Sequence, residues 1–135
     1  MSRFQWDESF SVKVSKFDDQ HKKLFGLVNL MFNAMSEGRG REVLGDLFNE
    51  LADYVETHFK AEEAAMRVHR YPYTDEHMAE HEKLRAKVRE YREAFDSGKV
   101  INTIGVLNFL KDWLTGHIMN TDKRYSAHMN DAGLR

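Results

Sequence analysis

Residues 58–81 read HFKAEEAAMRVHRYPYTDEHMAEH and contain two pairs of polar residues with helical spacing. His58 and Glu62 are four residues apart, as are His77 and His81, so each pair lies on one face of a helix, about one turn apart. The chain's only proline stands between the pairs, and proline ends helices because it lacks a backbone N–H. The stretch therefore predicts two helices that meet at a turn and carry their polar pairs close to that turn.

Apolar residues on a helical period extend this pattern over most of the chain. Glycine and proline clusters at 38–40, 72 and 97–98 interrupt it. Four amphipathic helices joined by short turns are typical of an antiparallel up-down-up-down four-helix bundle, so we expect an all-α fold. Apolar side chains alternate near the N-terminus, which predicts an extended N-terminal arm. The predicted elements are this arm at 1–17 and helices at about 19–37, 41–67, 74–96 and 99–127, in a single domain of residues 1–135.

The composition excludes several classes of function. Lys and Arg number 20 and Asp and Glu 22, a net charge of −2, so the basic excess of a nucleic-acid-binding module is missing. Cysteine is absent, which excludes disulfides, thiolate zinc sites, iron–sulfur clusters and cysteine nucleophiles. No apolar run is long enough to span a membrane and no secretory signal is visible, so we expect a cytoplasmic protein.

Residues that could bind a metal continue the apolar faces of the predicted helices. Unpaired polar side chains in a core cost several kcal/mol, so a whole layer of them needs a common partner, and a metal can be that partner. In an antiparallel bundle, the starts of helices one and three lie beside the ends of helices two and four. All the candidates fall in those four regions and are therefore expected to meet. They are His21, His58, Glu62, His77, His81, His117 and Asp122.

Asp122 is the candidate that a regular helix places least well. It follows His117 by five residues, which is about 140° further round an α-helix. A π-bulge would bring both side chains onto one face, and such bulges are frequent at functional sites. The spacing therefore predicts an irregular turn between His117 and Asp122.

The donor set of five imidazoles and two carboxylates restricts the metal. One tetrahedral zinc uses only four ligands. Calcium and magnesium prefer oxygen donors and would not select imidazoles. Two six-coordinate ions that share bridging carboxylates fit better, and iron, copper, nickel and zinc all suit imidazole-rich sites.

The order and spacing of these residues resemble the haemerythrin family, most closely the short single-domain bacterial haemerythrins. The resemblance runs from Trp6 to Tyr125. It rests on His21, on HFKAE at 58–62, on HMAEH at 77–81 and on HIMNTD at 117–122.

The resemblance implies two non-haem iron ions with a bridging oxo or hydroxo group. It also implies that the second iron keeps an open position for dioxygen. The implied ligands are His77, His81 and His117 for the first iron, His21 and His58 for the second, and Glu62 and Asp122 as bridges. Residues close to these ligands on the apolar faces are expected to line the oxygen pocket, and they are Phe25, Phe59, Trp113, Leu114 and Ile118.

The expected function is reversible dioxygen binding, for storage or for delivery to an oxygen-requiring enzyme, by a monomer that is not itself an enzyme. Two alternatives stay open. The same irons could serve an oxidoreductase that reduces peroxide, nitric oxide or oxygen, or the chain could be an oxygen or redox sensing module. No nucleic-acid partner and no membrane span are expected.

Other candidate residues are expected to have only structural roles. His69 and His128 fall outside the constellation and are expected at the surface. Glu63 adjoins Glu62, and adjacent helical residues point about 100° apart, so Glu63 is expected to face away from the site.

Overall fold

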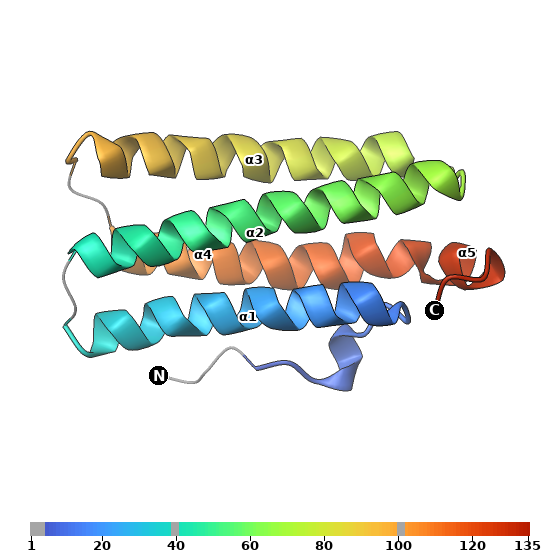
Figure 1. The fold of residues 1–135 in the computed structure, drawn as a ribbon, viewed down its shortest axis with the longest axis horizontal. Helices are drawn as coiled ribbons and strands as arrows, with labels where there is room; N and C mark the ends of the chain where they lie inside the picture. Colours follow the sequence, from blue (N-terminus) through green and yellow to red (C-terminus); the bar gives the residue numbers. More distant parts are fainter. Residues whose placement is uncertain (1–4, 39–40, 100–101) are drawn as a thin grey trace.

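The computed structural model describes residues 5–38, 41–99 and 102–135. Four long helices lie side by side in alternating directions, so the fold is an all-α four-helix bundle (Figure 1). These helices are α1 (Ser15–Ser36), α2 (Arg41–Val68), α3 (Thr74–Asp96) and α4 (Thr103–Gly116). Shorter elements are the 3₁₀ turn η1 (Glu8–Phe10), the π-helical turn η2 (His117–Thr121), the 3₁₀ turn η3 (Asp122–Tyr125) and α5 (Ser126–Asp131).

The core forms where the apolar faces of the four helices meet. Leu24 and Val28 of α1, Leu51 of α2, Leu84 of α3 and Leu107 of α4 are each at most 2% exposed. Full burial of one such side chain contributes about 1.5–3 kcal/mol. The starts of α1 and α3 and the ends of α2 and α4 lie at the same end of the bundle, beside α5 at the right of the view (Figure 1). Polar side chains on those segments are thus brought to one depth of the core.

The N-terminal arm differs from the expected extended segment of residues 1–17. Helix α1 begins at Ser15, four residues before the predicted start, and residues 8–10 form a 3₁₀ turn. The reason is Asp18, whose carboxylate accepts hydrogen bonds from the Val12 backbone N–H at 2.8 Å and the Ser11 hydroxyl at 2.6 Å. These bonds hold the arm against the first turn of α1. Residues 1–4 of the predicted arm lie outside the described residues.

The fourth predicted helix, about 99–127, is also corrected. Residues 100–101 lie outside the described part of the chain, and α4 begins at Thr103. Asn102 caps it, because its side chain accepts a hydrogen bond from the Gly105 N–H at 3.0 Å. The segment is not one continuous α-helix, since η2 and η3 separate α4 from α5. Among the described helices, none combines the length and the apolar character that crossing a membrane requires.

Candidate metal centre

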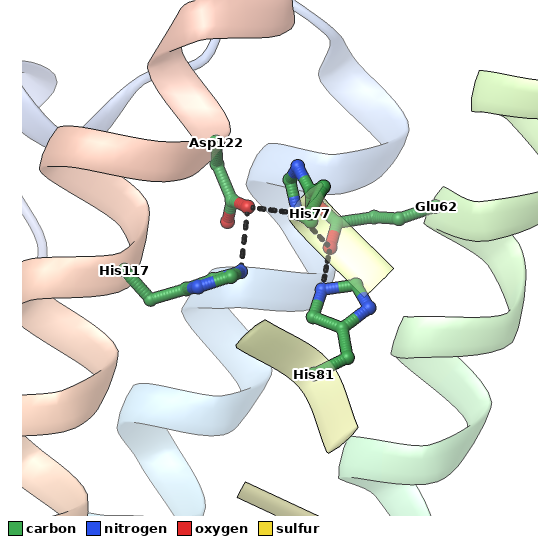
Figure 2. A group of neighbouring side chains, drawn as sticks. All are labelled: Glu62, His77, His81, His117 and Asp122. Carbon is green, nitrogen blue, oxygen red and sulfur yellow. Dashed lines mark ion pairs between the residues drawn. The ribbon is translucent and has the colours of Figure 1, made fainter. Parts of the chain in front are cut away.

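The structure brings the seven predicted ligands together at one end of the core. None is more than 7% exposed. Their donor atoms form two groups, in each of which the atoms lie within 4.8 Å of one another. Figure 2 shows the first group, in which side chains from three helical segments point toward a common centre. The groups are Glu62, His77, His81, His117 and Asp122, and His21, His58, Glu62 and Asp122.

The local backbone explains how each helix supplies its donors. On α2 and α3 the i, i+4 spacing of the polar pairs holds both side chains of a pair on the inward face. On η2 the Asp122 N–H donates to the His117 carbonyl, five residues earlier, which is the hydrogen bond of a π turn. This turn confirms the predicted irregularity. It lets His117 Nε2 lie 2.9 Å from Asp122 Oδ1.

Asp122 lies between the two groups. Its Oδ1 is 2.9 Å from the Nε2 atoms of both His77 and His117. Its Oδ2 is 3.1 Å from His21 Nε2. The two oxygens of one carboxylate therefore face different groups of histidines, as a bridging ligand requires.

Glu62 is shared in a similar way. Its Oε1 is 3.3 Å from His58 Nε2 in one group and 3.3 Å from His81 Nε2 in the other. The same oxygen lies 3.8 Å from His77 Nε2, and Oε2 lies 3.8 Å from His21 Nε2. Both carboxylates thus belong to both groups.

Most of these buried donor atoms have no hydrogen-bond partner among the described residues. Close approach without hydrogen-bond geometry indicates lone pairs that converge on a point between the side chains. Buried polar atoms without partners are costly, and metal ions at these points would satisfy them. The atoms are Nε2 of His21, His77, His81 and His117, Oε1 of Glu62, and both carboxylate oxygens of Asp122.

The electrostatics of the metal-free chain agree with this arrangement. Burial would raise the pKa of Glu62, but the charge of neighbouring imidazoles, His58 first, holds it well below its ordinary value. Burial would likewise raise the pKa of Asp122, yet His117 and its neighbours hold it well below. Burial would lower the pKa of His77, but the two carboxylates raise it to about 10. Both carboxylates are therefore ionised in the metal-free chain, as ligands of metal cations must be.

Comparison with known proteins identifies the family. The Hemerythrin HHE cation binding domain matches residues 12–128. The chain belongs to the haemerythrin family. It is 34% identical to the "Bacteriohemerythrin" of Methylococcus capsulatus over 93% of this chain and 95% of that protein. It is 32% identical to "Myohemerythrin-1" of Phascolopsis gouldii over 93% of this chain and 94% of that protein.

Solved structures agree with the fold. A crystal structure of wild-type haemerythrin superimposes with a TM-score of 0.87 at 34% identity, covering 93% of this chain and 96% of that one. A single-residue variant of haemerythrin superimposes with a TM-score of 0.89 at 33% identity, covering 95% of this chain and 98% of that one. The four-helix bundle is therefore arranged as in other haemerythrins.

Three contacts behind the candidate ligands were not anticipated from the sequence. The Tyr125 hydroxyl donates to Glu62 Oε2 at 2.6 Å, and the Gln20 amide oxygen contacts Nδ1 of His58. Glu63 Oε2 lies 2.8 Å from Nδ1 of His81. The apolar face of the fourth predicted helix continues to Tyr125, which indicates that Tyr125 points inward. The contacts of Gln20 with His58 and of Glu63 with His81 also join different helices, and no local pattern indicates them.

Glu63 has a contact that the sequence expectation did not include. Its side chain does point away from the Glu62 carboxylate, but α3 packs on that side of α2, so Glu63 is only 6% exposed. It contacts the outer nitrogen of His81 instead of solvent. The predicted rotation turns Glu63 away from the Glu62 carboxylate, and the packing of α3 places it against the far side of His81.

Aromatic rings from the predicted pocket lining pack directly on the candidate ligands. Phe59 stacks on His81 with ring centroids 3.7 Å apart, and Trp113 stacks on His117 at 4.3 Å. Both rings lie closest to the three-histidine group, whereas the pocket was expected beside the other one. Leu114 and Ile118 are at most 4% exposed. Whether any of them lines an oxygen pocket stays a prediction.

Phe25 lies on the other side of the site, in a cluster with two residues of the arm. Its ring packs edge-on against Trp6 at 5.7 Å and against Phe10 at 5.1 Å. Trp6 in turn stacks over His21 at 6.5 Å. The arm therefore covers the two-histidine group, a role that the alternating pattern of residues 1–17 did not reveal.

The remaining histidines lie outside the candidate centre, although the surface positions expected for them are only partly correct. His69 and His128 are both half-buried. The Nε2 atom of His128 contacts the backbone carbonyl of His69 at 2.6 Å, and its ring packs against Tyr71. These contacts attach α5 to the end of α2.

Proposed function

We propose that this haemerythrin binds two iron ions with an oxo or hydroxo bridge and that it binds dioxygen reversibly. The observation that carries the proposal is the pair of buried donor groups that share two carboxylates. Five imidazoles and two shared carboxylates fit a pair of transition-metal ions better than one tetrahedral zinc or a calcium ion.

The ligand assignment follows from the two groups. Three imidazoles would hold the first ion and two would hold the second, so the second ion would have one protein donor fewer. When bound, the iron pair supplies the redox chemistry through which dioxygen is taken up and released. The proposed ligands are His77, His81 and His117 on the first ion, His21 and His58 on the second, and Glu62 and Asp122 on both.

The protein's own residues hold the site in shape and keep it dry. Tyr125 donates a hydrogen bond that fixes the orientation of the Glu62 carboxylate. Leu114 and Ile118 are buried apolar side chains beside the ligands on the fourth helix. Trp6 and Phe25 cover the two-histidine side. Exclusion of water from this region would favour release of intact dioxygen over irreversible oxidation.

Reversible binding, and not catalysis, is the role that the donor set favours. Oxygen-activating di-iron sites in helix bundles have four Glu and two His as ligands. The candidate site here has five imidazoles and two carboxylates. Relatives named bacteriohemerythrin and myohemerythrin, each at least 32% identical, support the same role. We propose storage of oxygen, or its delivery to an oxygen-requiring enzyme, as the biological use.

The proposal is tested by loading the metal-free protein with Fe(II) under argon and counting bound iron. Visible spectra are then recorded through cycles of oxygen and argon. We expect two irons per chain and an absorption band that appears in oxygen and disappears under argon. Two irons that oxidise once without recovery would replace the carrier with the oxidoreductase alternative. Failure to hold two irons would overturn the metal assignment.

A further inference from the structure

The imidazole ring of His81 is contacted at one edge by Glu63 and on one face by Phe59. Its Nδ1 lies 2.8 Å from Glu63 Oε2 in a buried contact. The Phe59 ring lies parallel to it, with centroids 3.7 Å apart and an interplanar angle of 6°. With Nδ1 engaged, the free nitrogen Nε2 is directed at Glu62, 3.3 Å from its Oε1.

Arg85 contacts both residues that constrain His81, namely Glu63 and Phe59. Its guanidinium binds Glu63 through two nitrogens, at 2.9 and 3.2 Å. The same group lies over the Phe59 ring, 5.2 Å from its centroid. Arg85 therefore supports His81 by two separate routes, one through a carboxylate and one through an aromatic ring.

The position of Arg85 is itself fixed. Its Nε and one terminal nitrogen bind Glu56 at 2.7 and 3.1 Å, and the other terminal nitrogen binds Glu82 at 2.7 Å. With the two bonds to Glu63, all five N–H donors of the guanidinium have carboxylate partners. Of these three carboxylates, Glu63 is the one that contacts His81.

This arrangement distinguishes His81 from His21, His58 and His77. The outer nitrogen of His58 contacts the neutral amide of Gln20. The Nδ1 atoms of His21 and His77 have no hydrogen-bond partner among the described residues. A carboxylate that accepts from Nδ1–H fixes the tautomer, leaves the Nε2 lone pair for metal, and makes the imidazole a stronger donor. Glu63 therefore acts on one of the two metal positions and not on the other.

We propose that Glu63, held by Arg85, is a positioning residue that fixes the metal-binding tautomer of His81 and selectively strengthens the three-histidine metal position. The inference rests on the proposed two-metal function and adds that the two positions differ in affinity partly because of Glu63. The inference predicts that the first metal ion added to the metal-free protein binds at the three-histidine position.

The test is a titration of the metal-free protein with Co(II), followed by calorimetry and by the visible bands of the bound ion. The variant Glu63→Gln keeps the shape of the side chain and removes its charge. We expect one of the two Co(II) ions to bind about 10- to 100-fold more weakly and the other to bind as in the wild type. The matched control Glu56→Gln also changes a partner of Arg85 but touches no candidate ligand, and we expect wild-type titrations.

A double-variant cycle tests the part assigned to Arg85. If Arg85 acts through Glu63, Arg85→Gln weakens the same Co(II) ion, and combining it with Glu63→Gln causes little further loss. Additive losses would show that Arg85 acts mainly through Phe59. Equal weakening of both ions in Glu63→Gln, or no weakening, would overturn the proposal.

A spectroscopic readout without metal separates this inference from the proposed function. Long-range ¹H–¹⁵N imidazole spectra of the metal-free protein, at about pH 8.5 and so above the ordinary pKa of histidine, report the tautomer of His81. We expect the Nδ1–H tautomer in the wild type and in Glu56→Gln, and a mixture in Glu63→Gln. If the wild type fails to bind two Co(II) ions, the proposed two-metal function and the filling order are wrong. The spectra of the metal-free protein still decide whether Glu63 fixes the tautomer of His81.

Discussion

At the scale of single residues, the hydrogen bond donated by the Tyr125 hydroxyl directly supports a candidate bridging ligand, Glu62. Tyr125 is fully buried and donates to Glu62 at 2.6 Å, while its ring stacks on His77. Burial and the nearby carboxylates raise the pKa of Tyr125 well above its ordinary value, so the hydroxyl keeps its proton and donates at every working pH. The bond therefore orients Glu62 in the metal-free protein.

The variant Tyr125→Phe keeps the stacked ring and removes this bond. Hydrogen bonds to charged groups contribute about 1.5–3 kcal/mol, so we expect the free energy of unfolding of the metal-free protein to fall by about that amount in urea titrations. Tyr73→Phe is the control, because Tyr73 is 46% exposed, and no change is expected. If Tyr125→Phe lowers the free energy of unfolding no more than Tyr73→Phe does, the buried hydroxyl contributes nothing to stability.

Leu114 tests the proposed apolar wall. Replacing a buried leucine by alanine costs about 2–5 kcal/mol and opens space beside the ligands, so Leu114→Ala should be less stable and should autoxidise faster after iron loading. Leu107→Ala is the matched control, since Leu107 is equally buried on the same helix but seven residues from Leu114. We expect it to lose similar stability without faster autoxidation. If neither Leu114→Ala nor Leu114→Tyr changes oxygen affinity or autoxidation, Leu114 is not part of the pocket wall.

At the scale of elements, the π turn η2 contains one residue more than a regular α-helical turn. This residue lies between the candidate ligands His117 and Asp122. The extra residue rotates Asp122 back onto the face of His117. Because the turn lies at the end of the fourth helix, the regular helix before it remains packed in the core.

Deleting Asn120 tests this interpretation. Asn120 is exposed within η2, and its removal should convert the turn into regular α-helix with His117 and the aspartate four residues apart. We expect the variant to keep two metal ions per chain. Deletion of exposed Asp112, in the regular part of α4, should instead rotate the following residues by about 100° and abolish metal binding. Metal counts with circular dichroism distinguish the outcomes, and loss of metal in both deletions would contradict the interpretation.

At the scale of the whole molecule, the candidate centre places the Glu62 and Asp122 carboxylates and the His77 imidazole inside the core, so their charge state affects global stability. The metal-free chain contains carboxylates with lowered pKa values and an imidazole whose pKa is raised to about 10. A group with a raised pKa in the folded state stabilises the fold fully below its unfolded pKa and progressively less up to its folded pKa. Carboxylates with lowered pKa values stabilise the fold above their unfolded pKa and lose that contribution as the pH falls.

The metal-free protein should therefore be most stable between about pH 4.5 and 6.5 and should weaken on both sides. On the alkaline side, we expect stability to fall between about pH 6.5 and 10, because the folded protein keeps a proton on His77 that the unfolded chain releases. Urea unfolding across this range measures the effect, and His77→Asn should remove most of the alkaline decline. Metal requires neutral imidazoles, so loading near neutral pH should release protons, which calorimetry in buffers of different ionisation enthalpy detects. Constant metal-free stability from about pH 6 to 9 would contradict the prediction.

The four-helix bundle, the seven candidate ligands and the π turn could all be predicted from the sequence alone. Each rests on a local pattern: the helical period of apolar residues, the four-residue spacing of His58 with Glu62 and of His77 with His81, and the five-residue spacing that ends at Asp122. Metal binding by these residues remains a prediction. The conformation of a helix depends mainly on neighbours in the chain, which is why such patterns are informative.

Only the tertiary structure decided which side chains meet across helices. Asp18 anchors the arm and lets α1 begin at Ser15, and Glu63 contacts His81 because α3 covers that side of α2. The Glu63 contact joins residues 18 positions apart in the chain and depends on which helix packs on that side of α2. Periodicity gives the direction of a side chain relative to its own helix, but the neighbour it meets depends on how the whole bundle packs.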